Sequence, residues 1–281
     1  MKTVSHDEVT LATEAFGSPT DPTLIMVMGA TASMLTWPDE LCAFLAQRGL
    51  HVIRFDHRDT GASTNLPLGT ATYAVEDMAN DVLAIADAYG VNRFHLMGMS
   101  LGAYISQILA LDAPQRVASL TLVSAEPLGW DGPALPHIAD DFLEHFGKLA
   151  DLDWTDRNAV TDFLFEIDRL SAGPAGLSDP AATRTRIGQI LYRTSSPQSM
   201  FNHASVTTRK DWTGRFRAIT APTLVIHGAV DPILPLDNGK ALAAGIPGAQ
   251  LLVLDDTGHE LPPRELPHIA DAVARHVRST L

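Results

Sequence analysis

The first half of the chain alternates between segments with strand-like and helix-like hydrophobic periods. Strands are predicted where apolar residues alternate or form short continuous runs, over 9–15, 24–28, 51–55, 93–97 and 119–123. Helices are predicted where apolar residues recur three and four positions apart, over 36–48, 75–89 and 100–111. Regular alternation of strand and helix is typical of a mostly parallel, doubly wound sheet covered by helices on both faces. The fold class is therefore α/β.

The alternation stops after residue 125 and returns near residue 222. Between these points the sequence contains no convincing strand, and Gly and Pro residues separate three segments of helical spacing, 140–150, 157–170 and 182–192. Two further strands follow at 223–227 and 250–254, with helices near 238–244 and 266–278. We therefore expect a core of residues 1–125 and 222–281. A helical cap, residues 126–221, is inserted before the penultimate core strand.

The strongest chemical signal is the segment Gly98-Met99-Ser100-Leu101-Gly102. It follows one predicted strand directly and opens a predicted helix, which is the context that a GxSxG nucleophile motif requires. The sharp turn from strand to helix lifts the serine hydroxyl above the sheet edge. It also brings the backbone so close on either side that only glycine fits. We expect Ser100 to be a catalytic nucleophile.

A serine hydroxyl needs a base to accept its proton and an acid to orient that base. Asp231 and His259 each come a few residues after one of the last two predicted strands, in the chain order Ser, Asp, His. The carboxyl ends of parallel strands share one edge of the sheet, so the three side chains are expected to meet there. Glu126, just past the strand at 119–123, is an alternative acid. Position favours Asp231.

Acyl transfer also needs two fixed N–H donors for the oxyanion of the transition state. One is expected from the backbone of Leu101, at the start of the helix after the nucleophile. The other is expected from Ala30 in the loop after the strand at 24–28, where Gly29 permits a tight turn. The candidate substrate-contacting residues are Met28, Met99, His57, Trp130, Phe146 and Tyr192.

Composition and charge limit the classes of partner. The 281 residues carry a formal net charge of −13, which argues against binding to nucleic acid or to an anionic membrane surface. Cys42 is the only cysteine, so no intramolecular disulfide can form. The N-terminal residues lack the apolar core of a signal peptide, and no run approaches the about 20 apolar residues of a membrane span. A cytoplasmic protein without metal or cofactor is expected.

Over nearly its whole length the chain resembles the α/β-hydrolase superfamily, and more closely its aclacinomycin methylesterase group, whose members hydrolyse a methyl ester on an anthracycline polyketide. The segments that carry the closer resemblance are Val27-Met28-Gly29, Trp37-Pro38-Asp39-Glu40, 51–61, 222–226, Asp231-Pro232-Ile233 and 258–262. The resemblance implies a triad of Ser100, Asp231 and His259, with Ala30 and Leu101 as oxyanion donors. Met28-Gly29 replaces the His-Gly of much of the superfamily, as it does in the methylesterase group.

These features predict a carboxylesterase that cleaves a small or medium apolar small-molecule ester, for example a methyl ester, through an acyl-enzyme. The same triad also fits a cofactor-free perhydrolase, a hydrolase of carbon–carbon bonds, or a receptor-like binding protein whose cap moves with ligand. The sequence leaves open whether the protein is a monomer or a homodimer.

Overall fold

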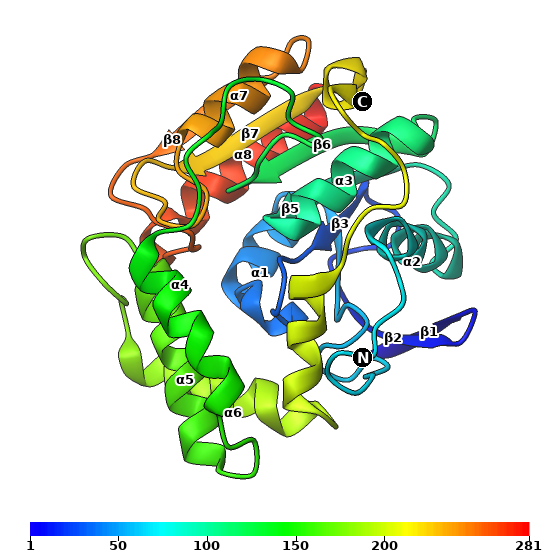
Figure 1. Cartoon of the computed structure of the whole chain (residues 1–281). Coiled ribbons are helices and arrows are strands. Elements are labelled where there is room, and N and C mark those ends of the chain that lie inside the picture. Colours follow the sequence, from blue (N-terminus) through cyan, green and yellow to red (C-terminus); the bar gives the residue numbers. More distant parts are fainter. Residues whose placement is uncertain (281) are drawn as a thin grey trace.

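A single sheet of eight strands organises the protein, which a computed structural model describes over residues 1–280 (Figure 1). The strands are β1 (Lys2–His6), β2 (Val9–Phe16), β3 (Thr23–Val27), β4 (His51–Phe55), β5 (Phe94–Met99), β6 (Val117–Val123), β7 (Thr223–Gly228) and β8 (Gln250–Leu254). Their spatial order is β1-β2-β4-β3-β5-β6-β7-β8. β2 runs antiparallel to both of its neighbours, and all other adjacent pairs are parallel. The predicted mostly parallel α/β sheet is confirmed.

Helices cover both faces of the sheet. They are α1 (Asp39–Gln47), α2 (Val75–Ala88), α3 (Leu101–Asp112), α7 (Asp237–Gly245) and α8 (Leu266–Arg278). Successive strand residues point to opposite faces, so Leu24 and Met26 of β3 pack in one core with α1 and α8. Ile25 and Val27 pack in the other core with α2, α3 and α7. This double coverage explains why the central strands are continuous apolar runs.

The segment between β6 and β7 is helical, and no strand occurs in it among the described residues. Its elements are α4 (Asp140–Gly147), η2 (Lys148–Asp151), α5 (Arg157–Ser171), α6 (Pro180–Arg193), η3 (Pro197–Ser205) and η4 (Arg215–Ala218). Asp156 and Asp179 cap the amino ends of α5 and α6, since each carboxylate accepts two backbone N–H groups. Figure 1 shows α4, α5 and α6 lying apart from the helices that cover the sheet.

This helical segment has its own small apolar core and is anchored to the main core at its two ends. Phe163 and Phe201 pack together in a cluster separate from those of the sheet. Leu128, Trp212 and Phe216 instead pack in the same cluster as α3. The part of this segment that packs independently of the sheet is therefore shorter than the whole segment between β6 and β7.

One strand was not predicted from the sequence. In β1 only Val4 is buried, so the alternation of apolar and polar residues that marks a strand is almost absent. β1 forms because it pairs with β2 at the edge of the sheet. No helix within residues 1–280 is both long and apolar enough to span a bilayer.

Candidate active site

Ser100 occupies a strained turn between β5 and α3. Its backbone has φ 52° and ψ −120°, a region that residues with a side chain rarely adopt. The Ser100 N–H donates to the carbonyl of Val123 at 3.0 Å, which ties the turn to the end of β6. A Cβ at Gly98 would overlap the backbone of Gly102, and a Cβ at Gly102 would overlap the carbonyl of Val27. The two glycines thus allow the turn that presents the serine.

Asp231 and His259 form a tight pair beyond β7 and β8. The Nδ1 of His259 lies 2.8 Å from Oδ2 of Asp231, while Oδ1 accepts the N–H groups of Ile233 and Leu234 at 2.8 Å each. Burial acts to raise the pKa of Asp231, but the charge and hydrogen bond of His259 and the N–H of Leu234 outweigh it and lower that pKa. The ionised carboxylate holds the proton of His259 on Nδ1, so Nε2 is the nitrogen that can accept one.

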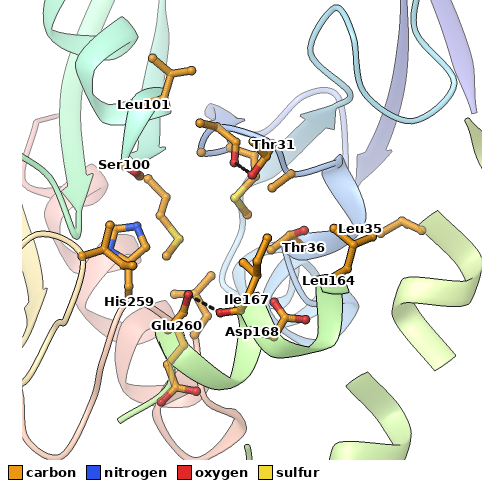
Figure 2. A pocket seen from close by; sticks show the side chains of 18 of the residues that line it. Thr31, Leu35, Thr36, Ser100, Leu101, Leu164, Ile167, Asp168, His259 and Glu260 are labelled. Carbon is orange, nitrogen blue, oxygen red and sulfur yellow. Dashed lines mark hydrogen bonds between the residues drawn. The ribbon is translucent and has the colours of Figure 1, made fainter. Parts of the chain in front are cut away.

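Ser100 and His259 border the same cavity, whose volume is about 1330 Å³. Figure 2 shows both side chains at one end of it. Within residues 1–280 no hydrogen bond joins Ser100 to His259. In many enzymes the hydrogen bond between nucleophile and base tightens only when substrate is bound. Glu126 also borders the cavity, but its Oε2 lies 3.4 Å from Nε2 of His137 and not beside His259.

The loop after β3 lies directly against Ser100. A Cβ added at Gly29 would be 3.2 Å from the Cβ of Ser100. Among residues 1–280, neither the N–H of Ala30 nor that of Leu101 donates a hydrogen bond. Two free backbone donors therefore flank the serine, one from this loop and one from the amino end of α3.

Two buried histidines hold this loop. Nε2 of His57 donates to the carbonyl of Met28 at 2.9 Å, and Nδ1 of His203 accepts the N–H of Thr31 at 3.1 Å. Nε2 of His203 donates to the carbonyl of Arg58 at 2.9 Å. Burial lowers the pKa of both rings, that of His57 to about 3 with a further contribution from His203. Both are therefore neutral at pH 7, as these hydrogen bonds require.

His203 was not identified from the sequence, because no local pattern marks it. It lies in η3, 172 residues from Thr31, with which it forms its hydrogen bond. His57 was expected to contact substrate, and that expectation is wrong. The ring is fully buried beneath the loop and does not border the cavity.

Of the remaining residues predicted to contact substrate, Met28, Met99 and Phe146 border the cavity. Trp130 and Tyr192 do not, which corrects the prediction. The ring of Trp130 packs against the main core instead, with its centroid 5.9 Å from that of Phe216. Tyr192 is 84% exposed, because α6 turns its apolar residues inward and leaves this ring outside.

The wall of the cavity is mainly apolar. Representative apolar side chains from the core and from α4, α5, α6 and η3 are Leu35, Phe142, Leu164, Ile167, Ile190 and Met200. The ion pair between Asp168 of α5 and Arg186 of α6 also borders it, as do the paired side chains of Glu126 and His137. In the part of the chain that the structure describes, no cluster of three or more His, Cys, Asp or Glu side chains is arranged to hold a metal ion.

Comparison with known proteins agrees with this geometry. Residues 22–263 match the family described as the alpha/beta hydrolase fold. The chain is 32% identical to a rhodomycin D methylesterase of Streptomyces sp. (strain C5), with 98% of this chain and 97% of the relative covered. A rhodomycin D methylesterase of Streptomyces peucetius is 31% identical over the same shares. Among solved structures, a thermophilic esterase from Thermogutta terrifontis is 25% identical, with a TM-score of 0.73 over 99% of this chain and 97% of that chain.

Proposed function

The chain belongs to the α/β-hydrolase fold family, and from this premise we propose that it is a serine carboxylesterase acting through an acyl-enzyme. One observation carries the proposal. Ser100, presented by a strained turn, borders the same cavity as His259, whose Nδ1 is held 2.8 Å from the buried carboxylate of Asp231. This is the arrangement of nucleophile, base and orienting acid that acyl transfer requires.

Each group has one role in the proposed reaction. Nε2 of His259 takes the hydroxyl proton of Ser100 as the oxygen attacks the ester carbonyl. The N–H groups of Ala30 and Leu101 donate to the oxyanion that forms. His259 then returns the proton to the departing alcohol, leaving the acyl group on Ser100. Water, activated by the same histidine, releases the acid and restores the serine.

The substrate we propose is the methyl ester of a bulky, largely apolar acid. The helical segment 126–221 acts as a cap whose helices, with the core, line a cavity of about 1330 Å³. This volume is larger than that of most small-molecule pockets. We therefore widen the range of proposed substrates from the small or medium esters expected from the sequence to larger esters. The 32% identity to a rhodomycin D methylesterase supports methanol as the leaving group.

A panel of esters that varies the acid and the alcohol separately tests this proposal. Methyl esters of polycyclic aromatic acids should be cleaved with a higher kcat/KM than acetate esters of alcohols of the same size. If the protein cleaves no ester, the proposal fails. If it instead forms peracids from carboxylic acids and peroxide, or cleaves dienones, as its dominant activity, a perhydrolase or a carbon–carbon hydrolase replaces it.

A further inference from the structure

The ion pair of Asp168 and Arg186 lies in the wall of a cavity that is mainly, but not wholly, apolar. Nη2 of Arg186 donates to Oδ2 of Asp168 at 2.7 Å, and the pair joins α5 to α6. The two side chains are 26% and 29% exposed, and both border the cavity. In Figure 2, Asp168 lies well away from Ser100 and His259. The charged pair is therefore remote from the proposed reaction centre but open to the same space.

The pair retains unused hydrogen-bonding capacity. Among residues 1–280, Oδ1 of Asp168 accepts no hydrogen bond, and Arg186 donates only through Nη2. A guanidinium group has five N–H donors and a carboxylate accepts through both oxygens. One acceptor and several donors thus remain next to each other.

Joining the two helices does not explain this pair. A second ion pair, Asp162 with Arg184, already connects α5 to α6 at 2.6 Å and does not border the cavity. Withdrawing two charges from water costs free energy, and apolar side chains of similar size often stabilise a protein as well as a buried ion pair does. A polar partner brought by the substrate would offset that cost.

We propose that Asp168 and Arg186 form a specificity subsite for a neutral hydroxyl group on the acid part of the substrate, remote from the ester bond. The pair has no net charge, so it does not select a charged group. A substrate ammonium would compete with Arg186 for Asp168, and a carboxylate would compete with Asp168 for Arg186. A phenol or alcohol can donate to Oδ1 of Asp168 and accept from the guanidinium at once. The inference rests on the esterase function proposed for Ser100.

A graded series of substrates tests it. Methyl benzoate, methyl 2-naphthoate and methyl anthracene-2-carboxylate are each compared with the analogue that carries a hydroxyl at the far end of the ring system. For one of the three ring systems, the wild type should cleave the hydroxylated ester with a kcat/KM about tenfold higher than that of the unsubstituted ester. This is the size of effect expected from a hydrogen bond to a charged group.

Variants separate recognition from structure. Asp168→Asn should reduce the tenfold preference, and Asp168→Leu combined with Arg186→Met should remove it while keeping the helices packed. The matched control, Asp162→Asn, alters the outer ion pair between the same helices and should leave the preference unchanged. A melting temperature measured for each variant identifies any loss of fold.

The results that would overturn this inference differ from those that would overturn the proposed esterase function. The inference is overturned if the wild type shows no preference at any ring length, or if the variants lower kcat/KM equally for both members of each pair of esters. If no ester is cleaved, the esterase proposal fails. Calorimetric binding of the same esters to Ser100→Ala then decides the inference: a similar preference for the hydroxylated ester supports it, and equal affinities or no binding overturn it.

Discussion

The Nδ1 atom of His203 accepts the backbone N–H of Thr31 at 3.1 Å. This hydrogen bond joins η3, in the helical segment between β6 and β7, to the loop that lies against Ser100. Thr31 has φ 59°, in the left-handed region that a threonine adopts only when its surroundings hold it there. His203 is therefore a positioning residue for the neighbouring N–H of Ala30, the proposed oxyanion donor.

Replacing His203 by Ala should reduce kcat by about tenfold or more while changing KM less, because the displaced donor acts mainly in the transition state. His203→Asn offers a side-chain oxygen near the position of Nδ1 and should restore part of the lost rate. Steady-state kinetics with one methyl ester give both constants. A rise in KM alone, or equal losses in the two variants, would contradict the positioning role.

Gly29→Ala should lower activity with little change in stability. The added methyl group would lie 3.2 Å from the Cβ and 3.8 Å from the Oγ of Ser100, which is close enough to move the nucleophile. We expect about a tenfold fall in kcat, since small displacements of reacting groups are costly. Gly188→Ala in α6 is the control, because nothing lies within 4 Å of the added Cβ. It should stabilise the helix by about 0.5–1 kcal/mol and leave kcat unchanged.

Asp231→Asn should lower kcat by about 10³- to 10⁴-fold, because the amide no longer holds the proton of His259 on Nδ1. Glu126→Gln should change kcat little, since Glu126 is paired with His137. Single-turnover measurements on both variants compare the two candidate acids directly. If the Glu126 variant loses more activity than the Asp231 variant, the assignment of the acid is wrong.

As the pH falls, the protein should begin to lose stability at a higher pH than that at which carboxylates usually titrate. Burial lowers the pKa of His57 to about 3, whereas in the unfolded chain it is about 6.5. As the pH falls below about 6.5, the unfolded state gains a proton at His57 that the folded state does not bind. The free energy of unfolding should therefore decrease between pH 7 and pH 5, by up to about 1.4 kcal/mol per pH unit for each such histidine.

Urea unfolding at pH 7, 6 and 5 checks this dependence. His57→Gln removes the titrating ring and keeps a donor for the carbonyl of Met28. The variant should show a smaller decrease over this range than the wild type, even if it is less stable throughout. Identical decreases in the two proteins would mean that His57 contributes nothing to the acid sensitivity.

The fold could be predicted because its strands are buried on both faces and its core helices are amphipathic. Where predicted strands and helices alternate along the sequence, a short continuous apolar run such as that of β3 indicates a buried strand. β1 escaped prediction because pairing with β2, rather than burial, determines it. The hydrophobic pattern of β1 does not indicate a strand, because only Val4 is buried.

The placement of the candidate site residues could be predicted only where topology dictates it. Ser100, Asp231 and His259 all follow mutually parallel strands of one sheet, so their proximity follows from strand direction. The hydrogen bond between His203 and Thr31 joins an irregular loop to a 3-10 helix far along the chain, and no sequence period encodes such a contact. Tyr192 was misplaced because helical spacing does not reveal which face of a helix meets a cavity.

The most direct test of the central claim is to treat the protein with a serine-directed alkyl phosphonate and locate the adduct by peptide mass spectrometry. We predict one phosphonyl group per chain, on the peptide that contains Ser100, with esterase activity lost in proportion to labelling. Ser100→Ala should be inactive and should take up no label. An adduct on another residue, or full esterase activity in Ser100→Ala, would contradict the account.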